Sequence, residues 1–240
     1  RPFNWAINTL GMDLISPTQG LVFSYADAKK PSPRARAIPE DDLSRFLEAA
    51  KSSKYYNYYR IIALAGLRPS EGLGLQIRDI KDDHLEIRRG WTTDGLSKLK
   101  TDTAARDFVM TDELRQIVLE QKAAAAFKSK EGWLFPTDKR YPDMDAIQSA
   151  FKRTIAQTAI WERGGRNGLK KIRMLTPPVD FVLYDFRHTF ATEMADRGMQ
   201  ATALKSLMGH SDIIITLKYY VDLTDKMKKE ARRILEGRVL

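Results

Sequence analysis

The stretch Tyr184–Thr192, with the sequence YDFRHTFAT, is the most informative part of this chain. It is followed by LMGHSD at residues 207–212 and by KYYVD at residues 218–222. The first stretch opens a predicted helix over Asp185–Arg197, and a second predicted helix, Ala201–Met208, leads into the next stretch. Arginine, histidine and tyrosine side chains recur at these places, so they are the first candidates for a functional site.

Composition restricts the class of protein. The chain has 240 residues, 43% hydrophobic and 30% charged, which suits one large globular domain or two modest ones. It contains no cysteine, which excludes disulfides and thiolate chemistry, and its three histidines are widely spaced, so we expect chemistry without a metal or cofactor. No apolar run approaches the ~20 residues of a membrane span, and the start, RPFNW, is not a signal peptide. We therefore expect a cytoplasmic protein with no membrane partner.

The charge balance points to a polyanionic partner. Forty Lys and Arg residues against 31 Asp and Glu give a net charge of +9, and the pI is near 9.6. One segment concentrates the positive charge, with the basic residues Arg163, Arg166, Lys170, Lys171 and Arg173. This segment is predicted to be a loop, either merely solvated or in contact with the phosphates of DNA.

The chain is predicted to have two parts. Residues 1–35 contain the end of a helix, over residues 3–15, and an exposed linker, and residues 36–240 form the main domain. Further helices are predicted at Pro39–Ala50, at Tyr56–Ala65, from Pro69 onward, and at Asp112–Ala125, Asp143–Ala159 and Asp222–Leu235. Short strands are predicted at Ile77–Ile80, Leu85–Arg88 and Arg106–Met110, with a polar loop over Thr93–Thr103. The predicted fold class is α+β, mainly α-helical, with a small antiparallel sheet on one side.

Together these stretches resemble the signature of the phage integrase family of tyrosine recombinases. That family has a Gly-Leu-Arg-x-Ser-Glu segment, matched by GLRPSE at residues 66–71, far upstream of a His-x-x-Arg-His-Thr segment, matched from Tyr184. Between them it places a lysine in a β-hairpin, which Lys100 followed by Thr101 resembles. The resemblance runs from about Arg36 to Leu223 and keeps the family's order of motifs.

The resemblance implies a site-specific recombinase that cleaves and rejoins DNA through a covalent 3′-phosphotyrosine, as in integration or excision of mobile elements. Its partner would be double-stranded DNA, with a monomer free in solution and a homotetramer on DNA. It further implies an integrase-type catalytic domain over 36–240, preceded by the last helix of a core-binding domain, in a bacterial, archaeal or phage-encoded protein.

The physical chemistry of the matched residues is consistent with these roles. Cleavage of a phosphodiester needs cations directed at the non-bridging oxygens, where charge develops in the transition state. Arginine suits this task because its guanidinium makes bidentate bonds to phosphate and stays charged. We assign Arg68 and Arg187 to this clamp, His210 as a further donor and His188 as a possible proton-transfer partner. Lys100 would protonate the leaving 5′ oxygen.

Two positions depart from the family pattern. Tyr184 stands where the first histidine of His-x-x-Arg is usual, and a neutral phenol there can still donate a hydrogen bond to phosphate. The nucleophile of the family lies nine or ten residues after the Gly-His histidine, which means Tyr219 or Tyr220. The run Tyr220–Leu223 fits the family better, so Tyr220 is the predicted nucleophile and Tyr219 the alternative. Neighbours on a helix point about 100° apart, so only one can face the phosphate.

Each assignment has a simpler alternative. The two arginines could be surface residues paired with Asp185 and Glu71, and His188 could be structural. Glu71 is expected to cap its helix or hold Arg68 rather than act on DNA. Lys98 lies two residues from Lys100 and could take its place, since hairpin registers slip easily. For the whole chain, a type IB topoisomerase and a non-catalytic helix-turn-helix DNA-binding protein remain rival functions.

Overall fold

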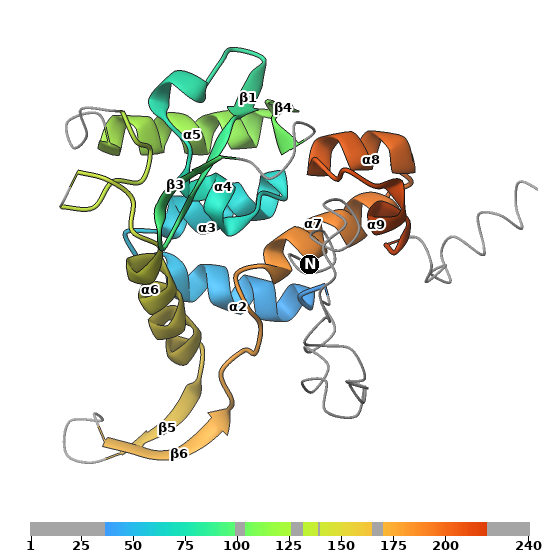
Figure 1. Cartoon of the computed structure of the whole chain (residues 1–240). Helices are drawn as coiled ribbons and strands as arrows, with labels where there is room; N and C mark the ends of the chain where they lie inside the picture. The colour runs from blue at the N-terminus through green and yellow to red at the C-terminus, as the bar shows by residue number, and fades with distance from the viewer. Residues whose placement is uncertain (1–36, 99–103, 126–131, 139, 165–169, 220–240) are drawn as a thin grey trace, which may run out of the picture. The chain divides into compact units, whose positions relative to one another are not determined.

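The computed structural model describes residues 37–98, 104–125, 132–138, 140–164 and 170–219 (Figure 1). The chain divides into two compact units, Arg1–Ala35 and Arg36–Leu240, and all described residues belong to the second. The predicted helices over residues 3–15 and Asp222–Leu235, and the predicted linker before residue 36, lie outside the described residues.

The described unit is mainly helical. Its helices are α2 (Glu40–Ala50), α3 (Tyr56–Ala65), α4 (Pro69–Leu73), α5 (Asp112–Ala125), α6 (Met144–Gln157), α7 (Asp185–Asp196), α8 (Ala201–Met208) and α9 (Ile213–Leu217). Its strands are β1 (His84–Ile87), β2 (Arg89–Thr92), β3 (Gly95–Lys98), β4 (Arg106–Val109), β5 (Ile160–Gly164) and β6 (Lys170–Thr176). The predicted fold class is confirmed, although the strands pair two by two, as β1–β4, β2–β3 and β5–β6, all antiparallel. None of the helices in the described ranges is both long and apolar enough to cross a membrane.

Helix α3 is the centre of the fold. Its buried residues, Tyr58, Tyr59, Ile61, Ile62 and Ala65, lie on more than one face of the helix. The helix packs against both α5 and α7. The helix ends where predicted, because the next residue is a glycine with φ +58°. A buried helix with a sharp end gives the following residues, which begin the functional site, a rigid base.

An aromatic cluster joins α2, α6 and α7 to α3. The ring of Phe46 on α2 lies 5.1 Å from that of Tyr59, 5.2 Å from those of Phe151 and Phe181, and 5.6 Å from that of Phe186. Most of these pairs are edge-on, the arrangement that aromatic quadrupoles favour. The cluster therefore fixes α6 and the segment leading into α7 relative to α2 and α3.

The small strands differ from the prediction in three places. Ile77–Ile80 was predicted as a strand, but Ile77–Asp79 forms a 3-10 turn, in which the Asp79 carboxylate accepts a hydrogen bond from the backbone N–H of Gln76. The predicted polar loop over Thr93–Thr103 contains β3, which forms a hairpin with β2. The predicted basic loop over Arg163–Arg173 includes parts of β5 and β6, which pair as a ribbon extending beyond the end of α6 (Figure 1).

The turn after α8 carries the second histidine motif. Gly209 ends the helix with φ +62°, and a Cβ there would lie 3.0 Å from the Arg106 guanidinium and 3.2 Å from the Ala104 Cα. Asp212 then caps the short helix α9 by accepting a hydrogen bond from the Ile214 N–H at 2.9 Å. The sequence did not predict α9, because its run of β-branched residues disfavours a helix. The turn is thereby held at both ends.

Candidate functional site

Arg68 lies at the junction of α3 and α4. Its backbone N–H donates to Glu71 Oε2 at 2.9 Å, which closes the first turn of α4, and Pro69 occupies the first helical position. The Arg68 guanidinium also donates to Glu71 Oε1 at 2.5 Å and to the Gly209 carbonyl at 3.4 Å. Its side chain remains 30% exposed, so it is fixed at its base and accessible at one side.

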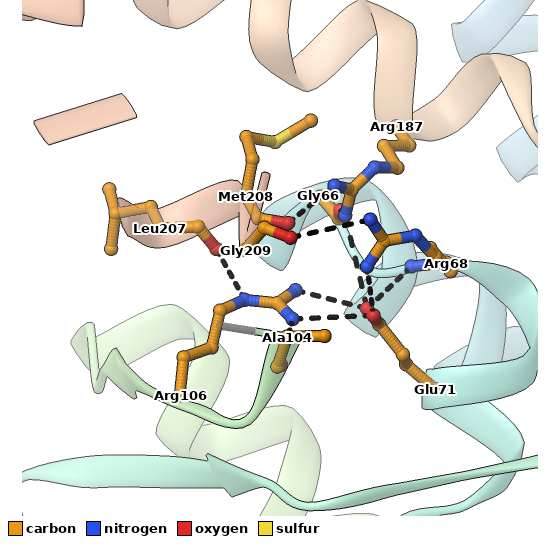
Figure 2. A network of polar contacts seen from close by, with 9 residues as sticks. All are labelled: Gly66, Arg68, Glu71, Ala104, Arg106, Arg187, Leu207, Met208 and Gly209. Atoms are coloured by element: carbon orange, nitrogen blue, oxygen red, sulfur yellow. Dashed lines mark hydrogen bonds and ion pairs between the residues drawn. The ribbon is translucent and has the colours of Figure 1, made fainter. Parts of the chain in front are cut away.

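Glu71 is the buried anion on which three arginines converge (Figure 2). It is 1% exposed, and Arg106 donates to its two oxygens at 3.3 and 3.0 Å. Arg187 Nη1 lies 3.8 Å from Glu71 Oε2. Burial alone would raise the pKa of Glu71, but the charge and hydrogen bonds of Arg106, followed by Arg187 and Arg68, outweigh it and lower the pKa. Glu71 is therefore a carboxylate at neutral pH, and it neutralises part of the charge of the cluster.

Arg187 is fully buried behind Arg68. It donates to the carbonyls of Gly66, at 2.7 Å, and Met208, while its buried Nε has no hydrogen-bond partner among the described residues. Burial, and then the nearby cation of Arg68, lower the pKa of Arg187 to about 10, which leaves it charged at neutral pH. In this arrangement Arg187 links the end of α3 to the end of α8. It is not among the described residues that line the cavity, so it acts on a group bound there by long-range electrostatic attraction, which is weakly screened in the protein interior.

The two candidate histidines lie on either side of Tyr219. His210 Nδ1 is 2.9 Å from the hydroxyl of Thr216, and its ring stacks on that of Tyr219 with centroids 6.5 Å apart. His188 Nδ1 is 2.7 Å from the Tyr219 hydroxyl, and its ring lies 5.0 Å from that of Tyr184. Burial, and then the surrounding arginines, lower the pKa of His210 to about 4, and burial also lowers the pKa of His188. Both rings are therefore neutral at neutral pH, and each can still offer one N–H.

A cavity of about 1030 Å³ opens beside these groups. Its polar lining includes Arg68, Lys98, Tyr184 and His210, which come from four separate segments of the chain. Helix α6 and residues 181–183 contribute mostly apolar side chains to the lining, together with Gln148 and Lys152. A cavity that combines cations and neutral donors with apolar side chains suits an anionic group.

The structure brings part of the predicted site together. Arg68, Tyr184 and His210 line the cavity, and Glu71 is reached from it, whereas Arg187 and Tyr219 are not among the described residues that line it. The predicted proton donor and the predicted nucleophile, Lys100 and Tyr220, lie outside the described residues, as does Arg166. Of the remaining basic residues, Arg163 lies in β5 and Lys170 and Lys171 lie in β6, while the exposed Arg173 is 3.3 Å from Glu162.

Arg106 and Lys152 at the site were not among the predicted residues, and Lys98 was predicted only as the alternative to Lys100. Lys98 ends β3 and lines the cavity, and the pair Asp94-Gly95 at the turn into that strand, a common hairpin turn, favours its place in a hairpin. Arg106 is the first residue of β4, where Arg106 and Phe108 are buried and the intervening side chain is exposed. An arginine on the apolar face of an alternating strand is the signal that could have identified it as buried and paired.

A separate cluster of possible metal ligands lies on the β1–β4 pair. His84, Glu86 and Asp107 offer ligand atoms within 4.8 Å of one another. Both carboxylates are already paired with Arg88, at 3.4 Å and 2.5 Å. These contacts are typical of an exposed ion-pair network, and the cluster contributes no residue to the cavity.

Comparison with known proteins identifies similar chains. Residues 36–227 match the family model described as Phage integrase family. The chain is 28% identical over 215 residues to the transposase from transposon Tn916 of Enterococcus faecalis, covering 82% of this chain and 50% of the relative. It is 25% identical over 227 residues to the tyrosine recombinase XerA of Saccharolobus solfataricus, covering 92% of this chain and 66% of the relative. The chain thus spans about half the length of the transposase.

Solved structures agree with this at the level of the fold. The Tn1549 transposon integrase, in a complex with circular intermediate DNA, superposes with a TM-score of 0.68 at 24% identity over 88% of this chain and 71% of the other. An XerA recombinase superposes with a TM-score of 0.60 at 21% identity over 88% of this chain and 67% of the other. With the family match covering most of the described unit, the chain belongs to the phage integrase family.

Proposed function

We propose that this chain is the catalytic part of a site-specific DNA recombinase that works through a covalent phosphotyrosine. The observation that carries the proposal is the cavity in which Arg68, Tyr184 and His210 face the same space, with the charged Arg187 buried behind them. Such a set of cations and neutral donors is suited to the non-bridging oxygens of a phosphodiester. The transposase of Tn916 and the tyrosine recombinase XerA, as relatives of this chain, support the same activity.

Each residue of the site is proposed to have a separate role in cleavage of the phosphodiester. Arg68 presents its exposed edge to the phosphate, and His210 donates from the ring nitrogen that is not engaged with Thr216. The tyrosine oxygen attacks phosphorus and gives its proton to water or to His188, the predicted proton-transfer partner. The bond from phosphorus to the 5′ oxygen breaks, and the phosphate becomes bonded to the tyrosine. A lysine protonates the departing 5′ oxygen, and the reverse sequence rejoins the strands.

We assign the attack to Tyr220 rather than Tyr219. The Tyr219 ring is packed on His210 and its hydroxyl is held by His188 at 2.7 Å, which suits a residue that fixes the two histidines. Burial also raises the pKa of Tyr219, which opposes formation of the phenolate. Adjacent side chains on a helix point in different directions, so a Tyr219 held by the two histidines is not the one expected to face the phosphate.

For the proton donor we retain Lys100, with Lys98 as the alternative. Lys98 lies at the end of the β2–β3 hairpin and lines the cavity, which supports a lysine of this hairpin as the donor. Lys100 follows two residues later and matches the family motif. Separate substitution of each lysine distinguishes them, because a substrate with a sulfur at the leaving position needs no proton donor and would restore cleavage only in the variant that lost the donor.

The partner is proposed to be double-stranded DNA. The basic residues of the β5–β6 ribbon, which extends from the body of the unit (Figure 1), would contact phosphates beside the cleaved bond. Residues 1–35 are proposed to end a core-binding domain, and the protein is proposed to be a cytoplasmic monomer that forms tetramers on DNA. Relatives in transposons support integration or excision of a mobile element as the biological reaction.

The test is recovery of a covalent protein–DNA adduct. The chain is incubated with a pool of nicked duplexes of random sequence, in which a short fragment diffuses away after cleavage and traps the intermediate. Denaturation, nuclease digestion and mass spectrometry then locate the phosphorylated residue. We expect a phosphotyrosine at Tyr220 in the presence of EDTA and without ATP. Absence of any adduct, or a strict need for magnesium, would refute the proposal, and relaxation of plasmid without sequence preference would favour a topoisomerase.

A further inference from the structure

We infer that Arg106 is a positioning residue that sets the relative placement of Arg68 and His210, a role that rests on the proposed function. It is a buried cation outside the predicted site, its side chain is 5% exposed, and it is not among the described residues that line the cavity. It therefore acts on the reaction only through the groups it holds.

The hydrogen bonds of Arg106 connect three segments (Figure 2). Its Nε donates to the Leu207 carbonyl at 2.5 Å, and Nη1 donates to the Ala104 carbonyl at 3.0 Å. Both terminal nitrogens donate to Glu71, the residue that also orients Arg68. One planar group thus joins the end of α8, the start of β4 and the first turn of α4.

This geometry needs an arginine. Only a guanidinium offers several N–H donors in fixed directions, so it can bind a carboxylate with two bonds and a carbonyl with a third. A lysine at this position could keep the charge near Glu71 but could not span to Leu207 at the same time. The close approach of Gly209 to the Arg106 side chain shows that the turn before His210 is shaped around this group.

Arg106 therefore affects the positions of Arg68 and His210 together. Arg68 is oriented by Glu71, and His210 follows directly on the turn that Arg106 contacts, so the two groups facing the cavity share one support. Loss of Arg106 would leave each group present but misplaced, and a misplacement near 1 Å can slow a reaction about a hundredfold.

The experiment compares Arg106→Met and Arg106→Lys with the matched control Arg89→Met. Arg89 is also largely buried and pairs with a buried carboxylate, Asp79, at 2.5 Å, but neither residue lines the cavity. With the duplex recovered as an adduct, we expect Arg106→Met to cleave about a hundredfold more slowly than wild type. Arg106→Lys should be intermediate, Arg89→Met should cleave like wild type, and all should bind the duplex equally.

Two further measurements separate positioning from general destabilisation. The second substrate is a duplex whose scissile phosphate carries a methyl group in place of one non-bridging oxygen. On it the ratio of the cleavage rates of wild type and Arg106→Met should be smaller, because the phosphate has less negative charge for the misplaced cations to stabilise. In the free protein, hydrogen exchange at the Gly209 and His210 amides should be faster in Arg106→Met and unchanged in Arg89→Met.

These outcomes keep the two proposals apart. If wild type forms an adduct and Arg106→Met cleaves as fast as Arg89→Met, the inference is overturned while the proposed function stands. If wild type forms no adduct, the proposed function fails, and the exchange measurement still decides whether Arg106 holds the turn. Unchanged exchange at residues 207–211 would overturn the positioning role in that case.

Discussion

Replacement of Arg187 by alanine should destabilise the protein as well as stop cleavage. The side chain is fully buried, donates to the Gly66 and Met208 carbonyls, and lies 3.8 Å from Glu71. Removal of one partner from a buried charged cluster costs about 3–5 kcal/mol. In a domain of this size each kcal/mol lowers the melting temperature by about 2–4 °C, so we expect a decrease of roughly 6–20 °C.

Arg68→Ala is the matched comparison for this prediction. Arg68 is partly exposed and faces the cavity, so its loss should reduce cleavage by about a hundred- to thousand-fold while changing the melting temperature much less. Arg187→Lys, which retains the charge but cannot reach both carbonyls, should melt between Arg187→Ala and wild type. Scanning calorimetry and single-turnover cleavage measure the two effects. If Arg187→Ala melts as high as Arg68→Ala, the reading of Arg187 as a structural link is wrong.

Four further outcomes are expected. Tyr220→Phe should form no adduct while Tyr219→Phe still does, as seen by denaturing electrophoresis, and the reverse result would exchange their roles. Burial lowers the pKa of His210 from 6.5 to about 4, so the unfolded chain binds that proton more tightly than the folded chain. The free energy of unfolding should therefore decrease as the pH falls from about 6.5 to about 4. Calorimetry should show a smaller decrease in His210→Asn. In salt titrations DNA affinity should fall by about 0.9 log units per log unit of salt for each phosphate contacted, and neutral substitutions within Arg163–Arg173 should flatten that slope. Truncation after Leu223 removes most of the predicted helix Asp222–Leu235, whose apolar stripe needs a partner surface, and should abolish multimers on DNA in sedimentation if that partner is a neighbouring subunit. Assembly like that of the intact chain would show that this helix docks only on its own domain.

The helices could be predicted well because their signals are local. Gly66 and Pro69 mark one end and the next start by backbone geometry alone, so the placement of Arg68 between two helices followed from the sequence. The same local reasoning gave Asp112–Ala125 and Ala201–Met208 with their observed bounds. Element type was therefore predictable wherever caps and apolar spacing agreed.

The contacts of the site could not be predicted in the same way. That Arg187 would bond to two carbonyls, and that Arg106 would share Glu71 with Arg68, depends on which strand and turn pack together. The β5–β6 ribbon was read as a loop because its charges and glycines outweighed the β-prone Ile160 and Trp161. Short strands depend on partners elsewhere in the chain, and such pairings are absent from any local pattern.

The long sequence separations around Glu71 have a consequence for how the chain folds. Arg68 is three residues away, but Arg106 is 35 residues away, and the Gly66 carbonyl meets Arg187 across 121 residues. Contacts of that range form late, because the entropy of a long loop is lost before the contacts that stabilise the closed loop have formed. If the Glu71 carboxylate were buried before the arginines reach it, its charge would have no partner, which is costly. Burial of Glu71 and formation of the contacts to Arg106 and Arg187 should therefore occur in one cooperative step. A partly folded chain would then lack the assembled arginine cluster, and with it the proposed phosphate site.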